Sequence, residues 1–233
     1  MAEAVSERGG GRARLSRERV IQAALSVADS GGLGSLTIRS LAKELGTKPM
    51  SVYYHVANKD EILTALVDIV FSEIQLPRPG GDWRSEMRKR ACSAREVLRR
   101  HRWAIGLLES RTDPGPANLR HHDTVLATLQ AAGFSAELTA HAYALIDSYV
   151  YGSALQEAAL PFQGPDRDGD VVEAIMQRMA EGEYPHLVHM ARSYYLQPGY
   201  DFGDEFGFGL DLILDGIESM LARGEAGAAG HRQ

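Results

Sequence analysis

One stretch of the chain, Leu36 to Leu63, constrains the fold most strongly. It predicts two short helices joined by a tight turn and followed by the start of a third helix. The apolar face of the first helix recurs at helical spacing and consists of Ile38, Leu41, Ala42 and Leu45. Thr37 stands where an N-cap residue belongs. Gly46 stands where helices often end in a left-handed residue.

The second short helix is predicted to have one buried side. Thr47 is expected to cap it, and Pro49 lies in its first turn, where a missing N–H costs little. Val52 and Val56 are four residues apart, so both are expected to anchor the same side of the helix to the rest of the domain. The opposite side is then free to face outward.

That outward side carries residues that suit a groove of duplex nucleic acid. It presents Lys48, Ser51 and Tyr53 or His55. Hydroxyls bond phosphates and base edges, and rings pack on sugars and thymine methyls. The next helix is predicted to begin at Asn58, with Glu61 completing a capping box and Lys59 placed to contact a phosphate. This is a helix-turn-helix pattern, and an ordinary helix pair with solvated polar residues is the alternative.

The same residues resemble a known family. The run L-T-x-R-x-L-A-x-x-L-G from Leu36, the segment Ser51–Val56 and the Asn58-Lys59 helix start are similar to the DNA-binding region of the tetracycline repressor (TetR) family. The resemblance implies a homodimeric repressor that binds a double-stranded DNA operator and is released by a small-molecule effector. The expected DNA-binding residues are Arg39, Thr47, Lys48, Pro49, Ser51, Tyr53, His55 and Lys59, of which Arg39 is assigned by the resemblance.

The distribution of charge agrees with a DNA-binding head. The chain carries a net charge of −6. Residues 1–59 hold nine Lys and Arg against five Asp and Glu, which gives +4, and residues 60–233 hold sixteen against twenty-six, which gives −10. A basic head on an acidic body orients a protein head-first onto a polyanion.

Composition excludes several other classes. No apolar run is long enough to span a bilayer and no apolar N-terminal segment indicates secretion, so we expect a cytoplasmic protein without a membrane partner. Cys92 is the only cysteine, which excludes an intramolecular disulfide and a Cys-rich zinc site. Cys92 is expected to be a buried or inert helical thiol, and a redox-sensing thiolate favoured by nearby cations is the alternative.

The predicted fold is all-α, with an N-terminal helix-turn-helix head and a C-terminal helical body. Residues 1–15 are expected to be a disordered basic arm that enters the minor groove or is merely flexible. Residues 16–75 form the head, including a connecting helix from Asn58 to about Glu73 that is apolar on more than one side. Residues 82–222 form the effector-binding and dimerisation body, and residues 223–233 form a flexible tail.

The body is predicted to contain six helices. Their expected ranges are Asp82 to Arg100, His101 to Leu108, Ala117 to Ala132, Ala136 to Leu160, Val171 to Ala180 and Asp204 to Leu221. Arg and Lys residues of the first are interpreted as a solvated face, and the third is expected to bury Leu119, Val125, Leu126 and Leu129. The last is apolar on two sides, so with the 136–160 helix it should form half of a four-helix bundle across a two-fold axis. By pattern, this half also looks like the C-terminal domain of TetR-like proteins.

No catalytic motif or Cys-containing metal motif is present, and we expect neither a metal nor a cofactor. His121-His122 and the pair His186 and His189 lack a third metal ligand at useful spacing. In the tetracycline repressor, two histidines help hold a magnesium–drug chelate. The nearest positions here are Ile74 or Gln75 and Leu107, and this departure argues against a magnesium–tetracycline ligand.

The effector pocket is expected between the body helices, where polar or aromatic residues occur on otherwise apolar helices. The candidate residues are Trp103, Leu107, Arg111, His122, Tyr143, Asp147 and Tyr151. For each one, packing in the core or at an interface is the alternative. The rival function is a helical small-molecule-binding or metal-dependent enzyme in which the head is only a packing unit.

Overall fold

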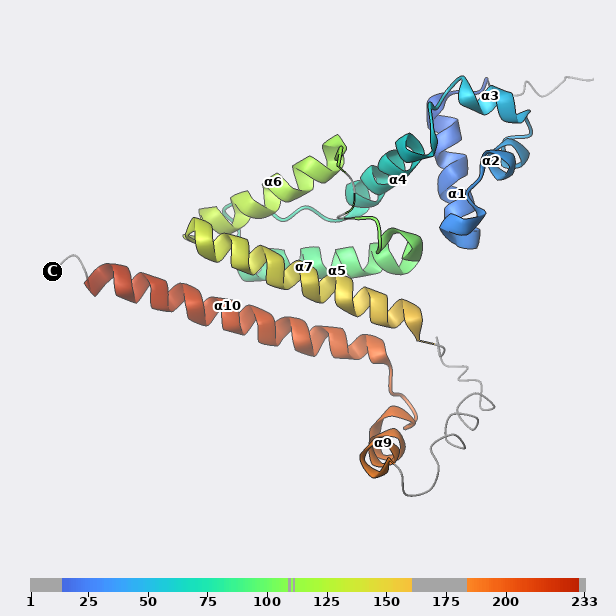
Figure 1. Ribbon diagram of the computed structural model, residues 1–233. Helices are drawn as coiled ribbons and strands as arrows, with labels where there is room; N and C mark the ends of the chain where they lie inside the picture. The colour runs from blue at the N-terminus through green and yellow to red at the C-terminus, as the bar shows by residue number, and fades with distance from the viewer. Residues whose placement is uncertain (1–13, 109, 111, 161–183, 231–233) are drawn as a thin grey trace, which may run out of the picture.

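The computed structural model describes residues 14–108, 110, 112–160 and 184–230, and within these ranges the chain forms helices, turns and loops but no strand (Figure 1). The head contains α1 (Arg17–Ser35), α2 (Ile38–Glu44) and α3 (Pro49–Tyr53). Helix α4 (Lys59–Glu73) leads from the head into the body. The predicted all-α architecture of a helix-turn-helix head and a helical body is confirmed.

Local hydrogen bonds explain where the head helices begin and end. The Thr37 hydroxyl accepts from the Ser40 N–H at 3.0 Å and the Ser40 hydroxyl accepts from the Thr37 N–H at 2.9 Å, which closes a capping box. Gly46 has φ 61°, the left-handed conformation expected for it. The prediction that Thr47 caps α3 is wrong. Lys48 occupies the N-cap position without a side-chain bond, because Pro49 begins the helix one residue later than expected.

The core of the head is made of apolar side chains. It gathers one buried stripe from each of the four helices: Val20, Ile21, Ala24, Leu41, Ala42, Val52, Ile62 and Leu66. Among the described residues of the head, every buried side chain is apolar. This composition gives a small unit whose core is held by hydrophobic burial.

Helix α4 belongs to both cores. Ile62 and Leu66 pack in the head, whereas Val67, Val70 and Phe71 pack in the core of the body. The prediction of a connecting helix that is buried on two sides is therefore confirmed. A displacement of α4 must disturb both cores at once.

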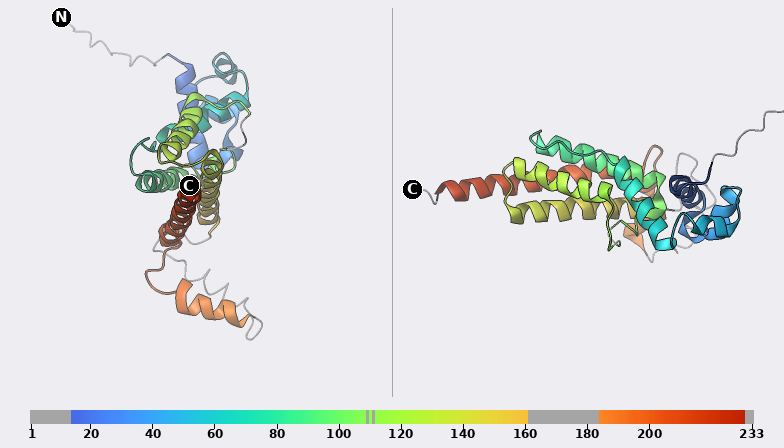
Figure 2. Two further views of the ribbon diagram at one scale, coloured as in Figure 1. Left: turned by 90° about the vertical axis from the view of Figure 1, so that its left-hand side faces the viewer. Right: turned by 90° about the horizontal axis from the view of Figure 1, so that it is seen from above.

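The body is a bundle of longer helices (Figures 1 and 2). Its members are α5 (Trp83–Arg100), α6 (Pro116–Ala131), α7 (Ala136–Ala159) and α10 (Glu205–Gly230). Helices α7 and α10 run side by side. The short α9 (Pro185–Met190) and the π-helical turn Ala191–Tyr195 lie apart from the packed helices. The helix expected over Val171 to Ala180 lies outside the described residues.

Three predictions about the body are wrong, and two of them equated apolar with inside. Arg90 is buried on the inner side of α5 rather than on a solvated face. Leu119 and Leu126 are exposed, since the buried stripe of α6 runs through Asn118 and His121 instead. The segment His101 to Leu108 forms only the 3₁₀ turn η1 (Arg102–Ala104) followed by further turns, because its carbonyls are mostly bonded three residues ahead.

Helix α10 continues beyond its predicted end at Leu221 to Gly230. It therefore includes residues for which the sequence predicts a flexible tail. Alanines and a glutamate in this segment are good helix formers and offset the cost of its glycines.

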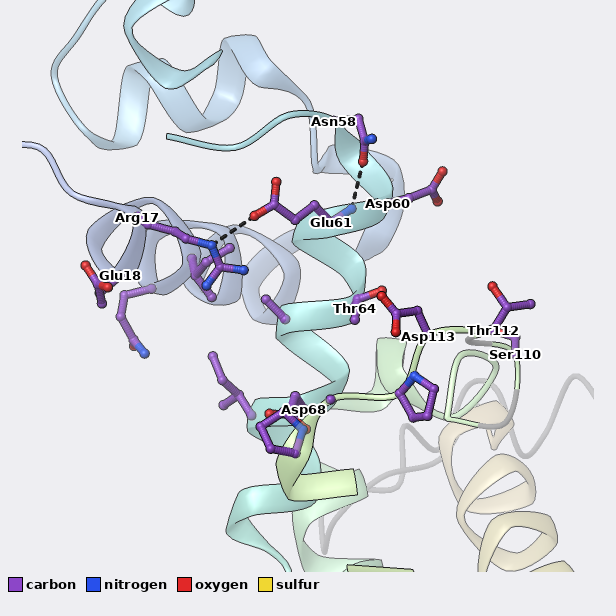
Figure 3. Close-up of a pocket in the computed structure, with 17 residues that line it drawn as sticks. Arg17, Glu18, Asn58, Asp60, Glu61, Thr64, Asp68, Ser110, Thr112 and Asp113 are labelled. Atoms are coloured by element: carbon purple, nitrogen blue, oxygen red, sulfur yellow. Dashed lines mark hydrogen bonds and ion pairs between the residues drawn. The ribbon is translucent and has the colours of Figure 1, made fainter. Parts of the chain in front are cut away.

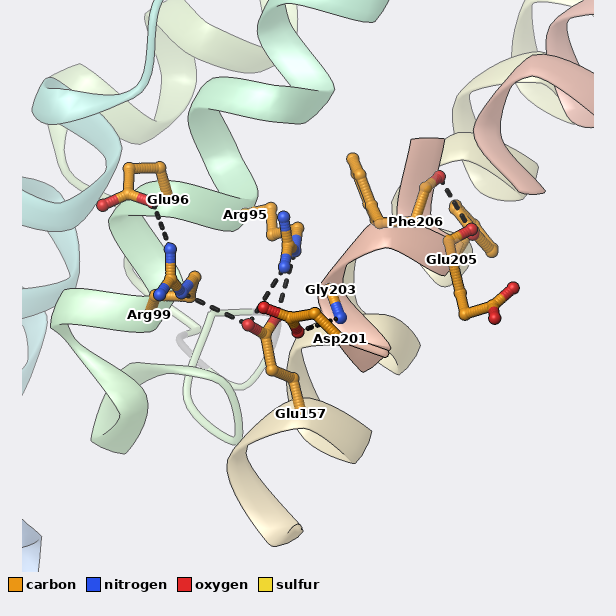
Figure 4. Close-up of polar contacts among 9 residues, drawn as sticks. Arg95, Glu96, Arg99, Glu157, Asp201, Gly203, Glu205 and Phe206 are labelled. Atoms are coloured by element: carbon orange, nitrogen blue, oxygen red, sulfur yellow. Dashed lines mark hydrogen bonds and ion pairs between the residues drawn. The ribbon is translucent and has the colours of Figure 1, made fainter. Parts of the chain in front are cut away.

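Ion pairs tie the end of α7 and the start of α10 to α5 (Figure 4). Arg95 donates to both carboxylate oxygens of Glu157, at 2.9 and 3.0 Å, and Arg99 lies 3.2 Å from the same carboxylate. The Arg95 guanidinium also lies 5.2 Å from the centre of the Phe206 ring, a cation–π distance. These contacts fix the long helices beside the core of the body.

Candidate DNA-binding surface and effector site

Helix α3 buries one side in the core of the head and leaves its other side chains exposed to solvent. Val52 and Val56 are buried, as their spacing predicts. The side chain of Tyr53 is 50% exposed. Arg39, Lys48, Pro49 and Lys59 are also exposed, whereas Thr47, Ser51 and His55 are half-buried. The structure thus leaves five of the eight predicted DNA-binding residues exposed and three half-buried, and their contact with DNA stays a prediction.

Two exposed side chains of this surface were absent from the predicted set. Tyr54 is 83% exposed and Met50 is 66% exposed. Each lies two residues from the buried Val52, so the spacing that predicts an anchored side also places these residues away from it. The two-residue separation from Val52 is therefore the sequence signal that predicts the exposure of Met50 and Tyr54.

A polar cluster, which we call the core cluster, lies inside the apolar body and consists of Arg90, His121, Asp147 and Tyr151. Arg90 donates from Nη1 to the Asp147 carboxylate and from Nε to His121 Nε2 at 3.1 Å. The Tyr151 hydroxyl donates to the other oxygen of Asp147 at 3.4 Å. Arg90 is 1% exposed and His121 is 0% exposed. Charged groups this deep are costly unless they are paired.

Burial changes the acid–base chemistry of the core cluster. It lowers the pKa of His121 to about 3, with further lowering from the nearby Arg90 cation and from His122. His121 is therefore neutral at physiological pH. Two polar atoms of the cluster, Arg90 Nη2 and His121 Nδ1, are buried and have no hydrogen-bond partner.

Four of the predicted effector residues are gathered at this site. Asp147 and Tyr151 belong to the core cluster, and Tyr143 hydrogen-bonds His122 beside it. Arg90 and His121 were not in the predicted set. A single arginine or histidine does not by itself predict burial. The signal that could have identified both residues is their position on the inner side of an amphipathic helix.

The other predicted effector residues lie elsewhere. Trp103 donates from Nε1 to Asp29 of α1 at 2.7 Å and contacts both cores, so it belongs to the joint between head and body. Leu107 is half-buried at the edge of the body core. Arg111 lies outside the described residues.

Polar contacts also connect head and body at that joint. His101 approaches Asp29 of α1 with Nδ1 at 2.7 Å and Glu73 of α4 with Nε2 at 3.2 Å. Nearer the middle of α4, the Asp68 carboxylate accepts from the backbone N–H groups of Ala117 and Asn118, at 2.8 and 2.9 Å. Asp68 thereby caps α6 from a neighbouring helix, because the N-cap Gly115 has no side chain to do so.

A cleft of about 1080 Å³ separates the head from the loop before α6 (Figure 3). Its walls are α1 and α4 on one side and residues 110 and 112–116 on the other. Arg17 and Glu61, 2.9 Å apart, close the end of the cleft where α1 meets α4. The head therefore contacts the body through α4 and the joint at His101, with open space beside them.

Other features of the described residues bear on the remaining predictions. No group of three His, Cys, Asp or Glu side chains there is arranged to hold a metal ion. Ile74 is buried in the apolar core, and Gln75 is exposed. Cys92 is exposed, which excludes the buried form of the predicted buried or inert thiol, and neither its inertness nor a redox role is tested. No helix in the described part of the chain is long and apolar enough to cross a membrane.

Comparisons with known proteins agree with this architecture. Residues 20–66 match the family model for bacterial regulatory proteins of the tetR family, and residues 76–221 match the tetracyclin repressor-like C-terminal domain. The HTH-type transcriptional repressor DrrR1 of Streptomyces coeruleorubidus is 34% identical and covers 93% of this chain and 83% of its own. The class C tetracycline repressor of Escherichia coli is 30% identical over 89% of this chain and 92% of its own.

Solved structures give the same result. The crystal structure of apo ActR from Streptomyces coelicolor superposes with a TM-score of 0.72 at 28% identity, covering 91% of this chain and 99% of ActR. The complex of ActR with actinorhodin gives the same TM-score and covers 90% of this chain and 99% of that one. The matches extend through both the head and the body, so this chain belongs to the TetR family of transcriptional regulators.

Proposed function

We propose that this protein is a homodimeric transcriptional repressor that leaves a pseudo-palindromic DNA operator when a small molecule binds in its body. The observation that carries the proposal is the exposed surface of α3 on a head whose core is apolar. The two α3 helices of the dimer enter successive major grooves, about 34–36 Å apart. The protein acts in the cytoplasm and by binding rather than by catalysis.

The residues of the surface have separate roles in this proposal. Lys48, Ser51, Tyr53 and His55 contact base edges or the backbone, and Arg39 and Lys59 contact phosphates. Thr47 and Pro49 bring the start of α3 close to the backbone. The exposed rings and thioether of Tyr54 and Met50 add apolar contact area beside them.

Exposed apolar side chains on α7 and α10 support the homodimer. Leu145 and Leu155 of α7 and Phe208 and Leu212 of α10 are all more than half exposed, and Phe208 reaches 68%. The two helices lie side by side (Figure 2), and both carry exposed apolar side chains. A second copy that adds the same pair of helices completes a four-helix bundle and buries this surface.

Helix α4 and its polar contacts transmit the effector signal. The effector binds among α5, α6 and α7, where the core cluster lies. Because α4 is packed in both cores and Asp68 caps α6, a movement of α6 displaces α4 and with it the head. Such release requires that the effector bind the DNA-incompetent conformation more tightly.

Fluorescence anisotropy on DNA from upstream of the protein's own gene tests the proposal. A salt titration beside a random duplex of equal length separates sequence-selective from non-selective binding. We expect selective binding with a steep salt dependence. The Lys59→Ala variant should weaken binding to both duplexes and lower the salt slope by about two, one for each protomer of the dimer. The Tyr53→Ala variant should reduce the discrimination between them.

Two results would count against the proposal. Equal and weak binding to the two duplexes, with no preferred sequence recovered by selection from random DNA, would reject the repressor function. An unaltered ratio of specific to non-specific affinity in Tyr53→Ala would remove Tyr53 from the residues that read bases.

A further inference from the structure

The core cluster contains two buried hydrogen-bond donors that nothing in the described chain satisfies. One is the Nη2 amino group of Arg90, which can only donate. The other is Nδ1 of His121. Arg90 Nε–H donates to His121 Nε2 at 3.1 Å, so in the neutral ring the proton must lie on Nδ1.

Unsatisfied donors at this depth are destabilising, and native cores rarely contain them without a cause. Arg90 and His121 are joined by one hydrogen bond, so both donors belong to the same small region between α5 and α6. Asp147 already pairs with Arg90, and its second oxygen accepts from Tyr151. The cluster therefore offers unpaired donors but no unused charge.

Rings border the same region. His121 and His122 lie 5.2 and 5.5 Å, centre to centre, from Phe71, and Tyr143 lies 5.4 Å from His122. His122, Tyr143 and Tyr151 are half-buried, so the cluster is close to the surface on their side. Aromatic side chains around a few fixed polar groups favour a flat ligand.

We propose that Arg90 and His121 anchor the effector, and that the effector is a planar aromatic compound with a hydrogen-bond-accepting oxygen, either a carboxylate or a carbonyl. This inference rests on the proposed function and names the ligand class of the same site. One acceptor oxygen of the effector takes the free proton of His121 Nδ1 on the side of the ring away from Arg90, a second acceptor atom can take that of Arg90 Nη2, and the aromatic plane lies among Phe71, His122 and Tyr143.

The anchor also explains how binding reaches the head. Phe71 belongs to α4 and contacts both histidine rings of α6. A ring inserted beside these histidines has to move them against Phe71 or separate α6 from α7. Either movement displaces α4 through a single side-chain contact.

A pair of His121 variants separates the two hydrogen bonds of this residue. His121→Gln keeps an acceptor near Nε2 for Arg90 but loses the donor at Nδ1. His121→Asn keeps a donor near Nδ1 but loses the acceptor. If the free donor binds the ligand, Gln should weaken binding by roughly tenfold or more and Asn should retain it. A merely structural role for His121 predicts the reverse, because only Gln preserves the bond to Arg90.

Isothermal titration calorimetry with three probes of similar size measures the binding. 2-Naphthoate carries a carboxylate, 2-acetonaphthone carries a neutral carbonyl, and 2-naphthylmethylamine is protonated and only donates. We expect one or both acceptor probes to bind and the amine not to bind. His121→Gln should weaken the acceptor probe by roughly tenfold or more, the effect of one hydrogen bond to a charged or buried group. The affinity of wild type should be constant between about pH 6 and about pH 8, because His121 stays neutral there.

Anisotropy on operator DNA, run on the same samples, keeps this inference separate from the proposed function. If operator DNA binds but no acceptor probe does, the ligand assignment is overturned while DNA binding stands. Equal binding of the amine, or unchanged affinity in His121→Gln, would also overturn it. If no operator binds, the proposed function fails, and calorimetry still decides whether Arg90 and His121 form an acceptor site.

Discussion

The head and the body are both helical, but their cores differ in kind. Every buried side chain in the described part of the head is apolar. The core of the body and its joint with the head also contain Glu86, Arg90, His101, Asn118, His121, Thr128, Thr139 and Asp147. An apolar core is enough for a unit whose function lies on its surface. Buried polar groups cost stability, so their presence in the body indicates binding and movement inside it.

The largest expected effect comes from breaking the buried ion pair of the body. Arg90→Met leaves the Asp147 carboxylate buried without its counter-ion, and the free energy of unfolding should fall by about 3–5 kcal/mol. The double variant Arg90→Met/Asp147→Leu should recover most of this loss. Chemical denaturation at one fixed protein concentration measures both. A single variant as stable as wild type would mean that the pair is not buried as described.

The pH dependence of stability sharpens the same contrast. The pKa of His121 is about 3 in the folded protein, below its unfolded value. Stability from its neutral form is therefore complete above the unfolded pKa and is lost as the pH falls towards the folded pKa. Unfolding free energy should fall by about 2 kcal/mol between about pH 7 and about pH 5.

His121→Gln is the control for this acid sensitivity, because glutamine does not titrate. Its unfolding free energy should change much less over the same pH range. Hydrogen bonds from Arg78 and then Lys89 lower the pKa of Glu86 to about 2. Its carboxylate therefore stays charged in the folded protein over this pH range and adds little to the change in stability. Parallel pH curves for wild type and the variant would contradict the neutral buried histidine.

A matched exchange of valine and threonine tests the two cores directly. Val52→Thr places a hydroxyl in the apolar core of the head and should cost about 1–3 kcal/mol. Thr139→Val in the body removes a buried hydroxyl that has no partner, so it should stabilise by about 1 kcal/mol. Thermal denaturation compares the two shifts. The contrast between the cores fails if both substitutions destabilise equally.

The smallest expected effect concerns the link between the regions. Asp68→Ala removes the cap of α6 and should lower stability by about 1 kcal/mol. It should also reduce the fold-change in operator affinity that an effector probe causes. Asp68→Asn keeps an acceptor oxygen and serves as the control. If the alanine variant responds to the probe as wild type does, Asp68 carries no coupling between α6 and α4.

The sequence predicted the head more fully than the body, for a physical reason. Capping residues such as Thr37 and Asn58 act on neighbours within a few positions, so their hydrogen bonds can be read from local spacing. The two-sided apolar pattern of α4 likewise indicated its place between two cores.

In the body, burial depends on partners that are distant in sequence. Arg90 is inside because Asp147, on another helix, compensates its charge, and no local pattern announces that pair. Leu119 and Leu126 are outside because α6 turns a partly polar stripe inward. Tyr143, Asp147 and Tyr151, which stood out as polar residues on an otherwise apolar helix, do lie in one region, and their contact with an effector stays a prediction.

The distance between the two recognition helices of the dimer tests the central claim most directly. A spin label at Glu44→Cys, an exposed position of α2 outside the proposed DNA contacts, in a Cys92→Ser background, places one probe on each head. Pulsed electron paramagnetic resonance should give a narrow distribution of label-to-label distances on operator DNA, because the two heads are then held at the half-site spacing of about 34–36 Å. Adding 2-naphthoate to the labelled dimer without DNA should shift the distribution of distances. The same addition to a labelled dimer that also carries His121→Gln should cause a much smaller shift. Identical distributions in the free, operator-bound and probe-bound states would contradict an account in which the body sets the position of the heads.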